Sequence, residues 1–173
     1  MDFANARPNI FLLGFMGAGK TTIGKLLAAA LGMHFVDLDD MIVDYHGCSI
    51  NDIFSQHGED TFRSFETQAL DRVARASNQV VSTGGGIVGR NENWPLMQRG
   101  GLTLFLECQW ETIVQRLKES TDRPLVNQNS LHGLNALYQL RLPLFCQADY
   151  VVQVDGLTPP EIVEAIKKLV LKD

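Results

Sequence analysis

The stretch NIFLLGFMGAGKTT, residues 9–22, decides the fold of this chain. Its apolar first part, residues 9–14, ends at a glycine and predicts a buried strand. The residues that follow match the pattern G-x-x-x-x-G-K-[ST] without a gap. A helix is expected from Lys20 to Leu31, because apolar residues recur there at helical spacing and Gly32 provides a C-terminal stop. A glycine-rich turn between a buried strand and a helix is the setting that a phosphate-binding loop (P-loop) needs.

Each residue type in this loop suits phosphate binding. Gly14, Gly17 and Gly19 allow a tight turn that points backbone N–H groups at phosphate oxygens. The positive end of the following helix faces the same point. Lys20 places an ammonium group on the β- and γ-phosphates, and the Thr21 hydroxyl is a ligand for Mg²⁺. The alternative is a glycine-rich turn with a chance lysine, and the strand before it and the helix after it disfavour that interpretation.

The rest of the chain alternates strands with helices, which predicts a three-layer α/β/α fold around a parallel sheet. The expected strands are 9–14, 34–39, 79–86, 102–107 and 150–154. Besides the helix from Lys20 to Leu31, a helix is expected to begin with Ser49 as its N-cap. Further helices are expected at 60–76, 94–100 and 109–118, from the end of the polar loop to about Cys146, and from Pro159 or Pro160 to Leu171. Ligands of such sheets bind at the carboxyl ends of the strands, so site residues are expected in 14–21, 37–39, 82–86 and the polar loop after 118.

Composition limits the class of protein further. With 173 residues, 45% of them hydrophobic and 20% charged, the chain suits one compact domain. The net charge of −5 argues against a nucleic-acid partner held by bulk electrostatics. Three cysteines without a CxxC pair favour free thiols in a reducing cytosol. Neither a signal peptide nor an apolar run of roughly 20 residues is found, so we expect a cytoplasmic protein with no membrane partner.

The other motifs choose among P-loop proteins. No NKxD-type segment for reading guanine is found, and the strand QVVST runs into GGG rather than into acidic residues. Both observations favour phosphoryl transfer to a small molecule over GTPase or ATPase activity. The four histidines are scattered and suggest no metal site.

Two carboxylates follow the second expected strand. Asp37 and Asp39 lie two residues apart, and on a strand such residues face the same side. Asp37 is then placed to hold Mg²⁺ through water, and Asp39 to accept a hydrogen bond from a substrate hydroxyl or take its proton. The alternative is helix N-capping by Asp39 or Asp40.

Arg63 and Glu66 lie one helical turn apart and can pair. They form either a solvated ion pair or a unit in which Glu66 orients Arg63 toward a substrate carboxylate, and both interpretations stay open. The three glycines at 84–86 either allow close backbone approach to a ligand or form a floppy loop. Arg123 in the polar loop is a candidate for the mobile arginine that stabilises charge on a transferred phosphoryl group, although lone arginines are usually surface residues.

Together these motifs resemble the shikimate kinase family. They occur in the family's order, GFMGAGKT, DLD, FRSFE, STGGG, DRPL, RLPLF and ADY, and the resemblance runs from about residue 9 to residue 171. It implies a P-loop kinase fold with a five-stranded parallel sheet of order 2-3-1-4-5. It also implies transfer of the γ-phosphate of ATP, with Mg²⁺, to the 3-hydroxyl of shikimate, a step toward chorismate and the aromatic amino acids.

The resemblance assigns roles residue by residue. Lys20, Asp39 and Arg123 match catalytic residues, and Arg123 is the lid arginine that reaches phosphates and substrate. Thr21 matches the Mg²⁺ ligand and Asp37 the acid that holds the metal through water. The nucleotide-binding residues that it implies are Gly17, Ala18, Gly19, Lys20, Thr21, Thr22, Arg116, Arg123 and Pro160.

It assigns the acceptor site in the same way. Arg63 and Arg141 match the pair that clamps the shikimate carboxylate, with Glu66 supporting Arg63. The shikimate-binding residues that it implies are Asp39, Phe54, Phe62, Arg63, Glu66, Gly84, Gly85, Gly86 and Arg141. Phe145 stands where the family often has a tyrosine, and the lid sequence VNQNSLHG is this chain's own.

Two other functions remain as alternatives. A gluconate-type sugar-acid kinase has a similar length and P-loop, but the triple glycine and the arginine before PLF speak against it. A catalytically inactive nucleotide-binding regulator is disfavoured by the intact Lys20, Thr21, Asp37 and Asp39.

The favoured interpretation also predicts the organisation of the chain. Residues 1–173 form one kinase domain, with substrate-binding helices at about 38–76 and a lid at about 119–130. The protein is expected to act as a monomer with ATP and shikimate as its small-molecule partners.

Overall fold

The computed structural model describes residues 7–119 and 128–171. A parallel sheet of five strands lies at its centre, in the order β2-β3-β1-β4-β5, which confirms the expected topology. The strands are β1 (Asn9–Leu13), β2 (His34–Asp37), β3 (Gln79–Ser82), β4 (Gly101–Glu107) and β5 (Tyr150–Gln153). Because β1 is the middle strand, the P-loop that follows it starts at the centre of the sheet's carboxyl edge.

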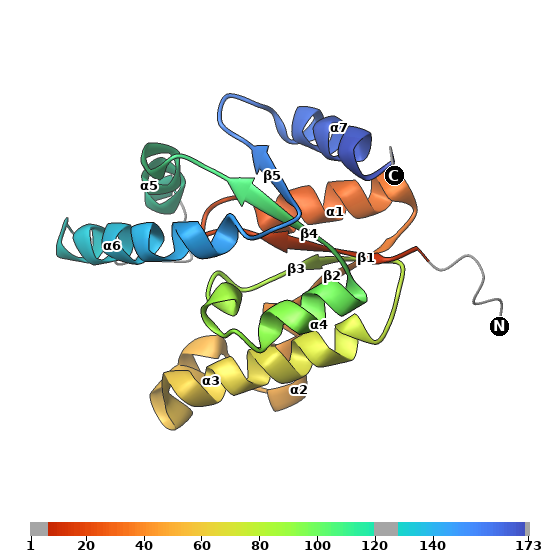
Figure 1. The fold of residues 1–173 in the computed structure, drawn as a ribbon. Helices are drawn as coiled ribbons and strands as arrows, with labels where there is room; N and C mark the ends of the chain where they lie inside the picture. The colour runs from red at the N-terminus through yellow and green to blue at the C-terminus, as the bar shows by residue number, and fades with distance from the viewer. Residues whose placement is uncertain (1–6, 120–127, 172–173) are drawn as a thin grey trace.

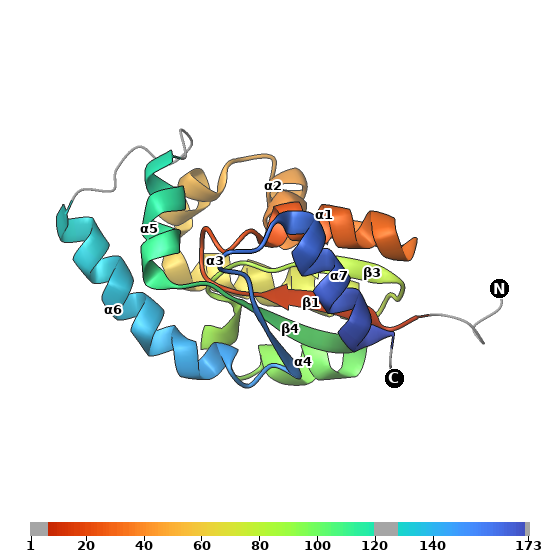
Figure 2. The ribbon, with the colours of Figure 1, turned by 90° about the horizontal axis from the view of Figure 1, so that it is seen from above.

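Helices cover both faces of this sheet (Figure 1). They are α1 (Lys20–Leu31), α2 (Leu38–His46), α3 (Ile50–Ala74), the 3-10 turn η2 (Ile87–Gly89), α4 (Asn93–Gly100), α5 (Trp110–Glu119), α6 (Gln128–Phe145) and α7 (Pro159–Val170). α1 packs with α7 on one face, and α3 packs with α4 on the other. α5 and α6 lie at the end of the sheet toward which β1 points (Figure 2).

The core follows from this layering. All five residues of β1 are buried, because helices cover both faces of the central strand. Phe11, Leu12 and Leu13 are fully inaccessible to solvent. The continuous apolar run that predicted a buried strand is therefore explained by its position. No helix in residues 7–119 and 128–171 is both long and apolar enough to cross a membrane.

Several predicted boundaries differ from the structure at the carboxyl edge. The second strand ends at Asp37 rather than residue 39, and α2 follows it at once, inside the range of about 38–76 in which helices were expected. The third strand ends at Ser82. Most of the predicted lid, residues 120–127 with Arg123 among them, lies outside the described residues, and residues 128–130 already belong to α6.

The start of α3 agrees with the prediction. Ser49 is its N-cap and forms a reciprocal capping box with Asp52. The expected helix at 60–76 joins this first segment across a kink at Gly58, whose φ of 79° and ψ of 171° are not helical. A positive φ of this size favours glycine, so Gly58 sets the angle between the two halves of α3.

We expect Asn9→Ala to destabilise the fold strongly. The Asn9 side chain is buried in β1, donates to the carbonyl oxygens of Val73 and Ala76, and accepts from the N–H of Gln79. Its removal takes away three hydrogen bonds that tie β1 to the end of α3 and the start of β3, so the free energy of unfolding should fall by about 2–4 kcal/mol. Urea denaturation measures this change. The exposed Asn51→Ala is the matched control, expected within about 0.5 kcal/mol of the parent, and a similarly small effect at Asn9 would contradict the assignment.

Candidate functional site

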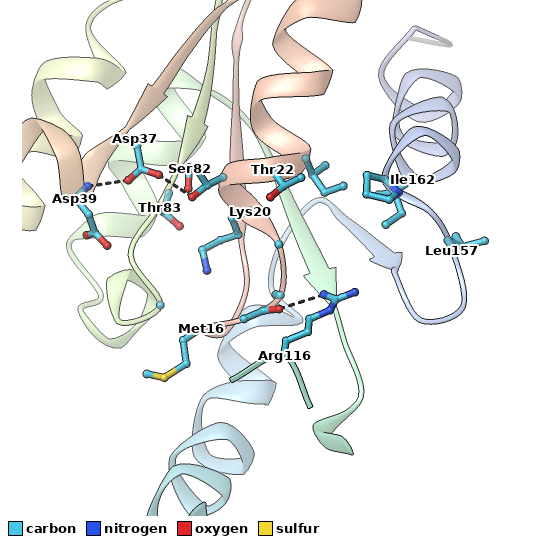
Figure 3. Close-up of a pocket in the computed structure, with 17 residues that line it drawn as sticks. Met16, Lys20, Thr22, Asp37, Asp39, Ser82, Thr83, Arg116, Leu157 and Ile162 are labelled. Carbon is cyan, nitrogen blue, oxygen red and sulfur yellow. Dashed lines mark hydrogen bonds between the residues drawn. The ribbon is translucent and has the colours of Figure 1, made fainter. Parts of the chain in front are cut away.

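A cavity of about 510 Å³ lies at the carboxyl edge of the sheet, where the topology predicts a ligand. Its wall is made by the P-loop, the ends of β2 and β3, one side chain of α5 and the segment that leads into α7 (Figure 3). The lining residues are Met16, Gly17, Ala18, Gly19, Lys20, Thr21, Thr22, Ile23, Asp37, Asp39, Ser82, Thr83, Gly85, Arg116, Leu157, Pro159 and Ile162. Lys20, Thr21, Asp37 and Asp39, which come from two of the segments where site residues were expected, all line this cavity.

The P-loop has the backbone that its glycines predict. Gly17 and Gly19 have φ values of 80° and 96°, in the left-handed region. Gly19 is also the N-cap of α1, so the N–H groups of the first helical turn open toward the cavity. The Lys20 ammonium donates to the carbonyl oxygens of Gly14 at 2.7 Å and Phe15 at 3.0 Å. These contacts hold its charge against the loop, where a phosphate chain would bind.

Asp37 connects the P-loop helix to the next element. Its Oδ2 accepts from Thr21 Oγ1 at 2.9 Å, and its Oδ1 accepts from the backbone N–H of Asp39 at 3.1 Å. Asp37 is thus the N-cap of α2, and Asp39 lies in the first turn of that helix. The prediction that both carboxylates share one strand face is wrong, as is N-capping by Asp39 or Asp40. The carboxylates of Asp37 and Asp39 nevertheless both reach the cavity, because the chain turns sharply at the strand end, where Asp37 caps α2.

The oxygen donors at this end of the cavity fit Mg²⁺. The Thr21 hydroxyl and the Asp37 carboxylate are hard ligands, hydrogen bonded to each other. Within residues 7–119 and 128–171, no group of three or more His, Cys, Asp or Glu side chains is arranged to hold a metal. Mg²⁺ commonly takes one or two protein ligands and fills its other positions with phosphate and water. The assignment of Thr21 and Asp37 to the metal stays a prediction that this donor set supports.

The opposite end of the cavity is more apolar. In Figure 3, Arg116, Leu157 and Ile162 lie on the other side of Lys20 from Asp37 and Asp39. Arg116 Nη1 donates to the Gly17 carbonyl oxygen at 3.1 Å and so holds α5 against the P-loop. Pro159, rather than the predicted Pro160, is the proline of this segment that lines the cavity. An apolar wall beside an arginine suits a nucleotide base.

Arg63 and Glu66 form a partly buried pair beside the cavity. Arg63 Nη1 donates to Glu66 Oε2 at 2.6 Å, and the Glu66 side chain is only 1% exposed. A solvated ion pair is therefore excluded. The glycines that follow β3 make room for this pair, because a Cβ at Gly84 would collide with Glu66 and one at Gly86 would collide with the Arg63 guanidinium. A side chain at 84 or 86 would thus force Glu66 or Arg63 to move, and this close packing argues against a floppy loop.

The charges of this pair support each other. Burial raises the pKa of Glu66, and the hydrogen bond from Arg63 opposes that shift. Burial acts to lower the pKa of Arg63, but its hydrogen bonds with Glu66 and Glu59 prevail and raise it. The pair is therefore a buried carboxylate that needs its guanidinium partner to stay ionised.

Arg141 brings a second guanidinium to the same place. Its Nη1 donates to the Gly85 carbonyl oxygen at 3.2 Å. Burial and, next in importance, the positive charge of Arg63 lower its pKa. Two cations held near each other attract an anionic group, and planar guanidinium forks suit a carboxylate. Phe54 and Phe62 lie nearby on α3 with ring centroids 4.7 Å apart.

Some of the predicted residues are not brought to the cavity itself. Arg63, Glu66, Arg141, Phe54 and Phe62 do not line it, but Gly85 links the two regions, since it lines the cavity and accepts from Arg141. Arg123 lies outside the described residues. Sequence reasoning expected site residues in 14–21 and 82–86, which include Met16, Ser82 and Thr83, but it gave these three no role. It missed Ile23, Leu157, Pro159 and Ile162 as lining residues. Ile23 directly follows the P-loop motif and was open to detection, whereas the positions of Leu157, Pro159 and Ile162 depend on packing between distant elements.

Comparisons with known proteins agree with this geometry. A family model described as Shikimate kinase matches residues 16–171. The shikimate kinase of Thermodesulfovibrio yellowstonii is 42% identical over 161 residues, which are 92% of this chain and 93% of the relative. The solved structure of shikimate kinase from Acinetobacter baumannii in complex with shikimate is similar with a TM-score of 0.89 and 34% identity. That match covers 96% of this chain and 94% of the other.

A gluconokinase from Sinorhizobium meliloti 1021 is also similar, with a TM-score of 0.58 and 17% identity over 97% of this chain and 94% of the other. At this identity the likeness shows the fold alone, so it lends the gluconate alternative no support.

We expect the Cys108 thiol, which lies beside Arg116 at the more apolar end of the cavity, to resist alkylation. Cys108 Sγ lies 3.7 Å from Asp155 Oδ1 and 3.8 Å from Arg116 Nη1, and the residue is buried. Burial and the Asp155 carboxylate raise its pKa to about 11, so at pH 8 only about one molecule in a thousand carries the thiolate. With iodoacetamide at pH 8, peptide mass mapping should show modification of the exposed Cys146 and not of Cys108. Equal rates at the two cysteines would contradict this picture.

Proposed function

This chain belongs to the shikimate kinase family, whose enzymes phosphorylate shikimate with ATP, and we propose that the cavity and the Arg63–Arg141 region carry out this reaction as the two halves of one active site. The observation that carries the proposal is the junction between them. Gly85 and Asp39 both line the phosphate cavity, Gly85 bonds to Arg141, and Asp39 lies close enough to Glu66 to raise its pKa.

The P-loop half binds the phosphates of ATP. Lys20 and the N–H groups at the start of α1 neutralise and orient the β- and γ-phosphates. Arg116, Leu157, Pro159 and Ile162 form the wall for the base. Mg²⁺, when bound at Thr21 and Asp37, neutralises charge on the transferred group.

The other half binds the acceptor. Arg63 and Arg141 hold the carboxylate of shikimate, with Phe54 and Phe62 beside its ring. Asp39, between the two halves, accepts a hydrogen bond from the attacking 3-hydroxyl and directs it at the γ-phosphorus. The new O–P bond then forms as the bond between the γ-phosphorus and the β-phosphate oxygen breaks, the hydroxyl proton passes to Asp39, and ADP leaves. Positioning provides most of the rate, because this type of transition state needs little covalent help.

The proposal also covers Arg123, which lies outside the described residues, and the oligomeric state and location of the protein. Arg123, in the predicted lid at about 119–130, keeps the role that the family resemblance assigns to it, which is to stabilise charge on the transferred phosphoryl group. The protein works as a monomer in the cytoplasm and as a single domain. The three free cysteines support the cytoplasmic location, because thiols stay reduced there.

The test of the function is a coupled ADP-release assay. We expect ADP release that depends on shikimate and on Mg²⁺, with gluconate inactive as the acceptor. Gluconate-dependent release would instead favour the sugar-acid kinase. ATP binding without shikimate-dependent ADP release would favour a regulator without catalytic activity.

We expect Arg141→Ala to weaken the acceptor half selectively. Loss of one charge-assisted contact to a carboxylate should raise KM for shikimate about ten- to a hundredfold. KM for ATP should change by less than about twofold, because Arg141 does not line the nucleotide cavity. Steady-state kinetics measure both constants. Arg99→Ala, which removes an exposed arginine paired with Asp71, is the control, and an equal rise in both KM values would contradict the assignment.

A further inference from the structure

A second carboxylate, Glu59, binds Arg63 on the side that Glu66 leaves open. Arg63 Nε and Nη2 donate to Glu59 Oε1 at 3.2 Å and 2.9 Å, while Nη1 donates to Glu66. The Nε–Nη2 edge is one of the edges with which a guanidinium binds a carboxylate through two parallel hydrogen bonds. In this structure that edge is therefore already occupied by a carboxylate of the protein itself.

The two carboxylates differ in how firmly they are held. The Glu66 side chain is 1% exposed, whereas that of Glu59 is 63% exposed. Both bonds from the Nε–Nη2 edge end on the single atom Oε1 of Glu59, which is a poorer arrangement than two parallel bonds to two oxygens. A pair with this much exposure to water contributes little net stability. Glu66 is thus a fixed partner of Arg63, and Glu59 is an exchangeable one.

The backbone places Glu59 for this role. Gly58, with its positive φ, interrupts α3 immediately before Glu59. Glu59 then begins the second half of the helix, and the i,i+4 spacing brings its side chain to Arg63.

Charge compensation gives Glu59 a reason to be there. Arg63 and Arg141 lie close enough that the charge of Arg63 lowers the pKa of Arg141, and Glu59 acts in the opposite direction on Arg141. Glu66 and Glu59 are the carboxylates of the described residues that act on both guanidinium groups, so without Glu59 and without an anionic ligand Glu66 would be their shared counter-ion. Glu59 adds a second negative charge at the solvent side of the pair.

We propose that Glu59 is a placeholder for the substrate carboxylate: it occupies the Nε–Nη2 edge of Arg63 in the empty enzyme and gives up that edge when the acceptor binds. This inference rests on the proposed function, in which Arg63 binds the carboxylate of shikimate. The incoming carboxylate offers two oxygens where Glu59 offers one, and the released Glu59 side chain returns to water at little cost because it is already mostly exposed. Glu59 is therefore a competitor that sets acceptor affinity, and it does not contact the substrate.

The proposal predicts that substitution of Glu59 strengthens shikimate binding, whereas loss of a binding-site residue usually weakens it. Glu59→Gln removes the competing charge and leaves Arg63 paired with Glu66, so shikimate should bind more tightly, with Kd lowered about two- to fivefold. A residue that only supported Arg63 would give weaker binding when substituted. Isothermal titration of the full-length protein with shikimate measures Kd directly, and Glu59→Ala repeats the test with a different side chain.

Two controls separate competition from general charge effects. Asp60→Asn makes the same change in net charge one residue away, at a fully exposed carboxylate that lies 3.8 Å from Arg90, and it should leave Kd unchanged. The methyl ester of shikimate lacks the competing carboxylate, so Glu59→Gln should not improve its binding. Tighter binding of shikimate alone supports the placeholder.

Three results would overturn the inference. Equal or weaker shikimate binding in both Glu59 variants removes the placeholder role while leaving the proposed function intact. An equal gain for the ester, or for Asp60→Asn, shows a general electrostatic effect instead. A parent protein that does not bind shikimate overturns the proposed function and this inference together.

Discussion

One carboxylate, that of Asp37, joins the elements on which the phosphate half of the site depends. It ends β2, caps α2 and accepts from Thr21 at the start of α1. Its two oxygens therefore set where the P-loop helix and the helix of Asp39 lie relative to each other. A side chain that shares its lone pairs between a helix cap and a neighbouring hydroxyl is oriented by both bonds. This orientation also presents the oxygens of Thr21 and Asp37 together, as Mg²⁺ binding requires.

Local patterns were sufficient to predict the sheet and the P-loop. Continuous apolar runs identify strands that helices cover on both faces, and the helix from Lys20 to Leu31 has the bounds that its spacing and Gly32 indicate. The end of β2 was predicted two residues too late, because the N-cap of α2 is the last residue of β2 and no polar loop separates the two elements. Sequence patterns predict the interior of a helix or strand better than a boundary at which one element follows another without a loop.

The acceptor half depends on contacts that no local pattern reports. The i,i+3 spacing of Arg63 and Glu66 allowed a pair, but burial of Glu66 to 1% exposure follows from packing against the loop after β3. Because of that packing, Arg63 and Glu66 form a partly buried pair rather than a solvated ion pair. The same holds for Pro159 and Leu157, which reach the cavity because α7 packs on α1. The tertiary structure was needed to find that Pro159 and Leu157 line the cavity. The location of the site at the strand ends could be predicted from the sequence.

The glycine loop at 84–86 sets the distance between the two halves. A Cβ at Gly85 would come within 3.5 Å of the Met16 backbone nitrogen, so this residue lies directly against the P-loop. On its other side, the Gly85 carbonyl oxygen accepts from Arg141, and Gly86 lies against Arg63. The groups proposed to hold the acceptor carboxylate thus contact the phosphate loop through three residues that have no side chains. Larger residues at 84 or 86 would displace Glu66 or Arg63 and, with them, the acceptor. In the proposed mechanism, alignment for in-line transfer therefore depends on the absence of side chains at 84–86 as much as on the charged residues around these glycines.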